Sequence, residues 1–163
     1  MTTRKRVFEL LDAFDTAMLV TTADDGLLEA RPMELADVEA DGPIWLLTSR
    51  HSRKVAEVQE SPEVLLVCQD GTRRAISVRG RARLVSDPAR IRRLWSETER
   101  PWYPGGPDDP DLALLAIDPV SAEFWDRSGA RRASFLWDAA RAYAAGERLD
   151  DAPDGDRHGR GRL

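Results

Sequence analysis

Apolar side chains recur along this chain at two different spacings. In TRKRVFELLDAF (3–14) they fall on one face of a helix, so a first helix is predicted there, with Thr2 or Thr3 as its N-cap. Short apolar runs separated by glycine-containing turns follow, a pattern typical of antiparallel strands. The predicted strands are TAMLVTT (16–22), LLEARPMELADVEA (27–40), IWLLTS (44–49), EVLLVCQ (63–69), RRAISVRGRARLVS (73–86) and LALLAIDPVSAEFWDR (112–127).

Three further helices are predicted in SRKVAEVQE (52–60), DPARIRRLWSE (87–97) and RASFLWDAARAYAAGE (132–147). Pro62 ends the first of these, Asp87 caps the second, and Gly146 ends the third. About six strands with so few helices do not fit a series of βαβ units. They predict a mainly β (α+β) fold, an antiparallel barrel with helices at its margin.

Prolines interrupt two of the predicted strands. Pro32 cannot donate to a ladder, so it predicts a sheet edge, a bulge or a local break beside Arg31. Asp118-Pro119 leaves open whether the last segment forms one strand or two. In VRGRARL (78–84) three arginines alternate with small and apolar residues, so one face of that strand is expected to meet solvent or a partner.

Length and composition predict one domain, residues 1–146, followed by a polar, flexible tail at 147–163. The formal net charge of −5 and the pI near 5.1 argue against a nucleic-acid-binding face. No apolar run is long enough for a membrane helix, and the first residues lack the pattern of a signal peptide, so a cytoplasmic protein is expected. The single cysteine, Cys68, excludes an intramolecular disulfide and a cysteine-based metal cage.

The segment TSRHSRK (48–54) places four basic residues between a strand and a helix: Arg50, His51, Arg53 and Lys54. The first N–H groups of the helix, nearby hydroxyls and these cations would together suit a phosphate group. The alternative is that Ser49 or Ser52 only caps the helix while the basic side chains lie in solvent. The residues alone leave both interpretations open.

WLLTSRHSRKVAEVQESPEVLLVC (45–68) resembles the flavin-binding segment of the pyridoxamine 5′-phosphate oxidase-like split barrels. EARPMEL (29–35), ISVRGRARLVSDPARIRRLW (76–95) and WYPGGPDDPDLALLAIDPVSAEFWD (102–126) resemble the general stress protein branch of that family. The resemblance runs from about residue 6 to residue 143. It implies a six-stranded antiparallel split β-barrel with flanking helices, bound FMN, and a homodimer whose two flavins lie at the subunit interface.

The resemblance also implies where the flavin is held. Thr48, Ser52, Arg53 and Lys54 would bind the phosphate, while Arg31, Pro32 and Met33 would line the isoalloxazine ring. Leu47, Ser49 and Trp125 complete the cofactor-binding residues that it implies. Trp102 and Tyr103 stay open between a wall of the site and anchors of the core or a loop.

The chain departs from the true pyridoxamine phosphate oxidases at their vitamin site. Ala36 stands where they have a lysine, Ala75 where a glutamine is expected, and His158 does not reproduce their C-terminal signature. The resemblance therefore implies an FMN-dependent oxidoreductase with an unidentified small-molecule redox substrate. The alternatives are a flavin store or sensor without turnover, or a barrel that holds another ligand such as a deazaflavin or haem. The sequence identifies no catalytic side chain and no metal site.

Overall fold

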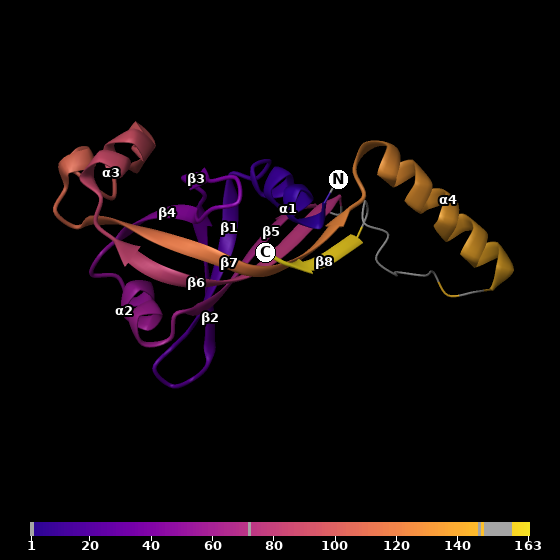
Figure 1. Ribbon diagram of the computed structural model, residues 1–163, viewed down its shortest axis with the longest axis horizontal. Coiled ribbons are helices and arrows are strands. Elements are labelled where there is room, and N and C mark those ends of the chain that lie inside the picture. The colour runs from indigo at the N-terminus through magenta and orange to yellow at the C-terminus, as the bar shows by residue number, and fades with distance from the viewer. Residues whose placement is uncertain (1, 72, 147, 149–157) are drawn as a thin grey trace.

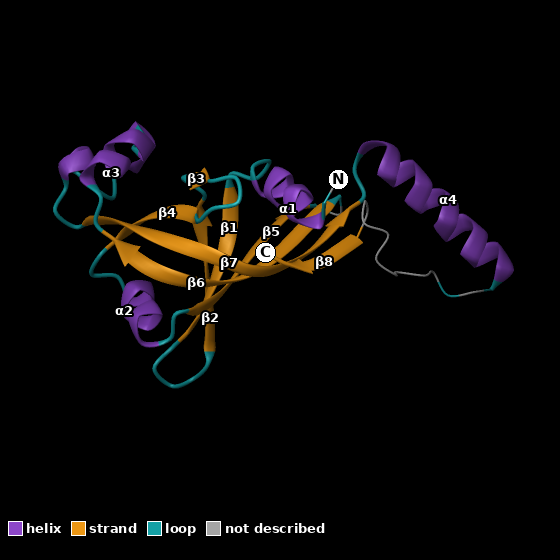
Figure 2. Ribbon diagram, viewed as in Figure 1, coloured by secondary structure: helices purple, strands orange, loops and turns teal. Residues whose placement is uncertain are grey.

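The computed structural model describes residues 2–71, 73–146, 148 and 158–163, and in them eight strands form one antiparallel sheet that curls into a half-barrel (Figures 1 and 2). The strand order is β2-β1-β5-β6-β7-β4-β3, and β8 also pairs with β7. The strands are β1 Thr16–Thr22, β2 Leu28–Glu34, β3 Asp37–Val38, β4 Ile44–Ser49, β5 Glu63–Asp70, β6 Arg74–Val85, β7 Leu112–Asp126 and β8 His158–Arg162. The predicted class, a mainly β split barrel with helices at its margin, is confirmed.

The helices lie at the margin of the sheet (Figure 2). They are α1 Thr3–Leu11, α2 Arg53–Glu60, α3 Pro88–Leu94 and α4 Gly129–Ala145, with short 3₁₀ turns η1 Glu97–Glu99 and η2 Gly106–Asp108. Their caps agree with the predictions from the sequence. Thr2 and Asp87 accept hydrogen bonds from the first turns of α1 and α3, and Gly146 ends α4 in the left-handed conformation. All four predicted helices are therefore confirmed.

The prediction of six strands is wrong, because two short strands were not anticipated. The predicted long strand at 27–40 ends at Glu34, and a second piece, β3, pairs with β4 instead of β1. Residues 158–162, predicted as part of a flexible tail, form β8 along the edge of β7. Gly159 allows this approach, because a Cβ there would lie 2.6 Å from a ring carbon of Phe124. Residues 147 and 149–157 of the predicted tail lie outside the described residues.

Pro119 does not divide the last predicted strand, because β7 runs unbroken from Leu112 to Asp126. The pairing of β6 with β7 instead shifts by one residue between Arg79 and Gly80, which face Ser121 and Pro119. Such a bulge accommodates a proline that cannot donate to the ladder. Pro32 needs no bulge: it lies on β2, the edge strand, and pairs in a continuous register with Met18.

The main core lies between α1, α2 and the concave side of the sheet, where the apolar side chains of Leu11, Leu19, Leu46 and Leu66 are fully buried. A second, smaller cluster packs α3 onto the start of β7 and contains Trp45. The first cluster holds α2 against β1 and β6, and the second holds α3 against β7, so both helices have fixed places on the sheet.

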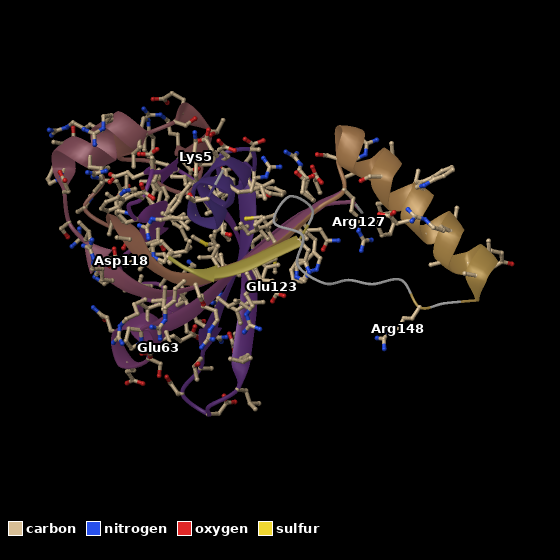
Figure 3. The ribbon with its side chains drawn as sticks, turned by 45° about the vertical axis from the view of Figure 1, so that its right-hand side comes forward. Lys5, Glu63, Asp118, Glu123, Arg127 and Arg148 are labelled. Atoms are coloured by element: carbon tan, nitrogen blue, oxygen red, sulfur yellow. The ribbon has the colours of Figure 1, made fainter. Side chains whose placement is uncertain are left out.

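Helix α4 leaves the sheet after Arg127 and extends away from it in both views (Figures 1 and 3). The guanidinium of Arg127 lies 4.0 Å from the ring centroid of Phe135, which fixes the start of the helix. Farther along, the side chains of Leu136, Trp137 and Tyr143 are 54%, 69% and 90% exposed. The helix was correctly predicted, but it does not cover the barrel.

Candidate functional site

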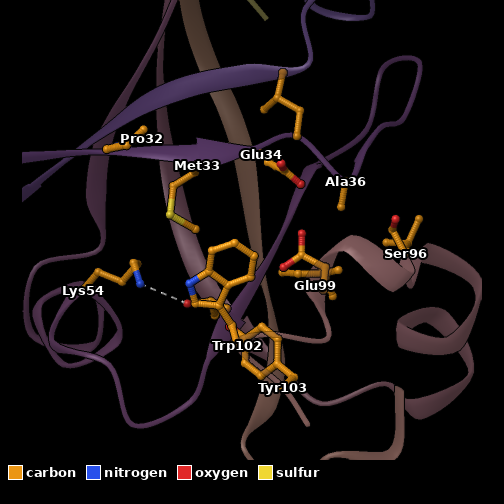
Figure 4. Close-up of a pocket in the computed structure, with 13 residues that line it drawn as sticks. Pro32, Met33, Glu34, Ala36, Lys54, Ser96, Glu99, Trp102 and Tyr103 are labelled. Carbon is orange, nitrogen blue, oxygen red and sulfur yellow. Dashed lines mark hydrogen bonds between the residues drawn. The ribbon is translucent and has the colours of Figure 1, made fainter. Parts of the chain in front are cut away.

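A pocket of about 570 Å³ lies between β2, β4, the first turn of α2 and the loop that follows α3 (Figure 4). Its volume falls within the roughly 300–1,000 Å³ usual for small-molecule sites. Its lining residues are Pro32, Met33, Glu34, Leu35, Ala36, Leu47, Thr48, Lys54, Leu94, Ser96, Glu99, Trp102 and Tyr103. The wall is mixed, with apolar side chains between a basic end and an acidic end.

Thr48, Ser52 and Lys54 meet at the basic end. The Lys54 ammonium donates to Thr48 Oγ1 at 3.4 Å, and the hydroxyls of Thr48 and Ser52 lie 3.5 Å apart. Ser52 occupies the N-cap position of α2, but its hydroxyl donates to the Ser49 carbonyl at 2.8 Å and makes no capping hydrogen bond to the first turn. The helix N-terminus, two hydroxyls and one ammonium are thus gathered at one spot, as an anion site requires.

Burial lowers the pKa of Lys54, and the positive charge of Arg31 lowers it further, while the carboxylate of Glu57 acts in the opposite direction. Desolvation and a like charge both disfavour the ammonium form. An anion bound beside Lys54 would relieve both effects, because it supplies the missing negative charge. The pocket therefore has a cation whose charge is poorly compensated by the protein alone.

The other three basic residues of the segment turn away from this pocket. Arg50 donates to the Leu112 carbonyl at 3.2 Å, and His51 pairs with Asp111 at 2.8 Å. Arg53 forms ion pairs with Glu29 and Glu57. The phosphate interpretation of the segment thus rests on Lys54 and the hydroxyls, whereas the solvated-patch interpretation fits His51, whose side chain is 80% exposed.

Arg31 lies behind the pocket wall and not in its lining. Its guanidinium donates to the Thr21 hydroxyl and to Glu57 Oε2, the latter at 2.9 Å. Glu57 is buried on α2 and also accepts a 2.5 Å hydrogen bond from Thr21 and a 3.1 Å hydrogen bond from Arg53 Nε. Arg31 therefore holds β2 to α2 and brings its positive charge near Lys54.

Two carboxyl groups face each other at the acidic end, from Glu34 on β2 and Glu99 on η1 (Figure 4). Burial raises the pKa of Glu99, and its hydrogen bond with Glu34 and the charge of that residue raise it further. Tyr103 lines the pocket nearby, and burial, with the charge of Glu99 as a smaller cause, raises its pKa to about 12. This end favours groups that donate hydrogen bonds, and it opposes a second anion.

The structure brings together half of the predicted cofactor-binding residues. Those that line the pocket are Pro32, Met33, Leu47, Thr48 and Lys54; those that do not are Arg31, Ser49, Ser52, Arg53 and Trp125. Ser52 still reaches Thr48. Trp125 lies eleven residues beyond Leu114, the residue of β7 that pairs with Leu47 of the pocket, which is about 35 Å along the strand. There it stacks on His158, with ring centroids 5.1 Å apart.

Sequence reasoning missed the acidic end and the buried Glu57. Trp102 and Tyr103, left open between site and core, both line the pocket, and Tyr103 also packs against the second core cluster. The Arg53–Glu57 pair has the spacing i, i+4 that joins charges on one helix face, so part of this network was visible in the sequence. No sequence signal indicated Glu99, because its loop has no regular period.

Within the described residues, no group of three or more His, Cys, Asp or Glu side chains could hold a metal ion. Over the same residues, no helix is both long and apolar enough to cross a membrane.

The sequence profile described as Pyridoxamine 5'-phosphate oxidase like matches residues 2–150. The chain belongs to this family. A general stress FMN/FAD binding protein from Xanthomonas citri is 33% identical over 78% of this chain and 90% of its own, with a TM-score of 0.65. General stress protein 26 from Bacillus anthracis and a chain from Jannaschia sp. CCS1 are 21% and 23% identical.

These two more distant structures bear on the fold of this pyridoxamine 5′-phosphate oxidase-like chain. The Bacillus anthracis protein matches 76% of this chain and 94% of its own, with a TM-score of 0.68. The Jannaschia chain matches 96% of both chains, with a TM-score of 0.72. A search of curated proteins gave no match. Family membership and split-barrel fold are thus established together.

The buried network gives this family member an expected acid sensitivity. Burial alone would raise the pKa of Glu57, but the hydrogen bond from Thr21 and the charges of Arg31 and Arg53 outweigh it and lower that pKa. A carboxyl whose pKa is lowered by folding contributes stability that is complete above its unfolded pKa and is lost as the pH falls through its folded pKa. We therefore expect the free energy of unfolding to decrease as the pH falls below about 4.5.

Urea denaturation at a series of pH values measures this dependence. Other carboxyl groups titrate in the same range, so the informative quantity is the difference between the protein and its Glu57→Gln variant. The variant should be less stable near neutral pH, and the difference should shrink as the pH falls below about 4.5. Equal dependence on pH in both proteins would show that Glu57 is not responsible.

Proposed function

We propose that this protein is an FMN-binding, oxidoreductase-like general stress protein. The observation that carries the proposal is the meeting of Thr48 and Lys54 with the apolar side chains of Pro32, Met33 and Leu47 in one pocket of a family member. The similar protein from Xanthomonas citri is an FMN/FAD binding protein, which supports a flavin as the ligand. A flavin that carries a phosphate, such as FMN, suits the pocket better than riboflavin because one end of the pocket is basic.

The residues of the pocket fit a phosphorylated flavin. The Lys54 ammonium and the hydroxyls of Thr48 and Ser52 match a phosphate in charge and hydrogen-bonding character. Met33 and Leu47 offer an apolar surface for a planar ring, and Trp102, 73% exposed, offers an aromatic face at the mouth of the pocket. Ala36 and the acidic pair at the other end do not match a phosphorylated vitamin, so this proposal excludes pyridoxine phosphate oxidation.

Each part of the pocket then has a task. Lys54 and Thr48 bind and orient the phosphate, the strands β2 and β4 exclude water from the ring, and Glu34 and Glu99 favour hydrogen-bond donors at the acidic end. Bound FMN supplies a centre that accepts reducing equivalents and passes them on.

We also propose that the protein acts as a homodimer. Trp125 does not line the pocket of its own chain, so the contact with the flavin that the family resemblance implies would come from a second copy. The exposed apolar side chains of α4 suit an interface in their composition. Sedimentation or light scattering of the protein with and without FMN measures the assembly.

The decisive first experiment is the visible absorption spectrum of the purified protein, followed by titration with FMN if it is colourless. Flavin bands, or saturable binding of added FMN, are expected. A colourless protein that ignores FMN contradicts the proposal.

Turnover is a separate question for the FMN-loaded protein. If it acts as an oxidoreductase, NAD(P)H or another donor should reduce the bound flavin, with bleaching of its visible absorption, faster than the same donor reduces free FMN. Tight binding without such bleaching over a broad panel of donors would favour a flavin store or sensor.

A further inference from the structure

The last strand, β8, lies on a part of the β7 edge that β4 does not cover. β4 pairs with residues 112–117 of β7, and β8 pairs with residues 121–125. The N–H of Leu163 donates to the Val120 carbonyl at 2.9 Å, and the Leu163 side chain packs against the main core. An uncovered strand edge offers its N–H and C=O groups to other chains. β8 therefore closes the sheet where β4 ends.

Most of β8 has little side-chain packing to hold it in place. Gly159 and Gly161 have no side chain, and Arg160 and Arg162 are exposed. Glycine inside a strand weakens it, so a strand of this composition opens at a low free-energy cost. His158 at the start of β8 differs, because its side chain is only 19% exposed. The attachment of the strand at this end therefore depends on His158.

His158 makes a hydrogen bond and a ring contact with β7. Figure 3 shows Glu123 beside β8, and Nε2 of His158 donates to Oε1 of Glu123 at 2.9 Å. The imidazole ring also stacks on the indole of Trp125, with the planes 15° from parallel. Both contacts are stronger for a charged imidazolium, because the hydrogen bond becomes an ion pair and a cation is attracted to the face of an indole. The strength of the attachment therefore depends on the pH.

We propose that β8 is a pH-sensitive clasp: with His158 charged it is held on the edge of β7, and with His158 neutral it opens more readily. Opening would expose the N–H and C=O groups of residues 121–125 and release Trp125 from its stack. Histidine changes its charge near pH 6.5, so physiological changes of pH would move this equilibrium. The clasp concerns the sheet edge and does not depend on the proposed binding of FMN.

The cations near His158 oppose its protonation, but less directly than Glu123 favours it. They are Arg160 on β8, and Arg73, Arg74 and Arg127, which line a pocket with Trp125. Arg160 and Arg73 are exposed, so water and salt screen their charges. Arg74 is paired with Asp70, and the guanidinium of Arg127 lies over a ring of α4. The direct hydrogen bond to Glu123 therefore dominates.

Helix α1 contacts β8 from its other face, where Gly161 approaches Thr3. The charged groups of this helix are already engaged or solvated: Arg4 pairs with Asp41, Arg6 with Asp126 and Glu9, and Lys5 is exposed. They do not compete with Glu123 for the imidazolium.

The pairing with Glu123 fixes the direction of the pH effect. A histidine that is held more strongly when charged contributes stability that is complete below its unfolded pKa and is lost as the pH rises through its folded pKa. We therefore expect β8 to be attached most firmly in mild acid and to open more often above neutral pH. The effect of Glu57 on the whole fold has the opposite direction, so the two are separable.

Amide hydrogen exchange of the full chain, measured from about pH 5.5 to about pH 7.5, tests the clasp. Rates are divided by those of an unstructured chain at the same pH, which gives a protection factor for each amide. The amides of β8 and Leu163 report the clasp, and those of β5, a strand paired on both sides, are the reference. The variants are His158→Gln, Glu123→Gln and the matched control His51→Gln, which changes the other, 80% exposed histidine.

In the wild-type protein, the protection of β8 relative to β5 should fall about 3- to 10-fold as the pH rises over this range. His158→Gln should abolish the fall, because glutamine can accept or donate a hydrogen bond but does not titrate. Glu123→Gln should reduce it to less than about 2-fold, since only the attraction to the indole remains. His51→Gln should leave it unchanged.

Two results would overturn the inference. One is a protection of β8 in the wild-type protein that does not change with pH relative to β5. The other is a His158→Gln protein that keeps the full fall, which would assign the effect to another group. If Glu123→Gln does not fold, the comparison of His158→Gln with the wild type still decides.

Discussion

Replacing Lys54 by alanine is expected to weaken FMN binding about 10- to 100-fold, because a charged hydrogen bond to a phosphate contributes about 1.5–3 kcal/mol. Lys54 lies on the pocket wall at the basic end, within 3.4 Å of the Thr48 hydroxyl. Among the described residues that line the pocket, Lys54 is the one cation, and the phosphate would lose it. Isothermal titration with FMN, or quenching of flavin fluorescence, measures the change.

Two controls separate this effect from damage to the fold. Riboflavin, which lacks the phosphate, should bind Lys54→Ala as well as it binds the wild-type protein. Lys5→Ala removes the charge of an exposed lysine on α1 and should leave FMN binding unchanged. Unchanged FMN affinity in a folded Lys54→Ala protein would show that the phosphate lies elsewhere.

Replacing Phe124 by alanine is expected to lower the free energy of unfolding by about 3–5 kcal/mol, the usual range for a buried phenylalanine. Phe124 on β7 is fully buried in the main core. Its ring also contacts the strand β8, because the space beside Gly159 is filled by it. The variant should therefore lose both core packing and the attachment of β8. Urea denaturation measures the stability, and amide hydrogen exchange measures the protection of β8.

Trp137→Ala is the matched control for this change. It also removes a large aromatic side chain, but one that is 69% exposed on α4. Its effect should stay within about 0.5 kcal/mol, as for other exposed positions in a single chain. If the two variants were equally stable, the assignment of Phe124 to the core would be wrong. A large loss in Trp137→Ala alone would indicate that α4 is covered by a second copy.

The sequence was sufficient to predict the fold class, because glycine turns separate its apolar runs clearly. Where it was insufficient, the reasons are local. HGRGR, the sequence of β8, has no apolar alternation, and the strand forms because Gly159 and Gly161 let it lie close to Phe124 and Thr3. The proline at 119 indicated a break, but a bulge in the pairing with β6 absorbs it. Both outcomes depend on neighbours that are distant in the sequence.

The candidate site, like the fold, could be predicted only in part from the sequence. The turn from strand to helix and the family resemblance both indicated Thr48 and Lys54, and these two residues line one pocket. They could not show that Arg31 and Arg53 turn toward Glu57, because that choice depends on how deeply a side chain of α2 is buried against β1. The acidic end depends on a loop without periodicity, which only the packing of α3 brings to the pocket.

The lowered pKa of Lys54 also makes this residue a chemical handle. The chain contains only two lysines, Lys5 and Lys54. An amine attacks an acylating reagent only in its neutral form, and burial and the charge of Arg31 increase that form at Lys54. An anion bound in the pocket would protect Lys54 from acylation at near-neutral pH. The extent of modification of Lys54, with Lys5 as the internal reference, would therefore report occupancy of the pocket by any anion, whether or not that anion absorbs visible light.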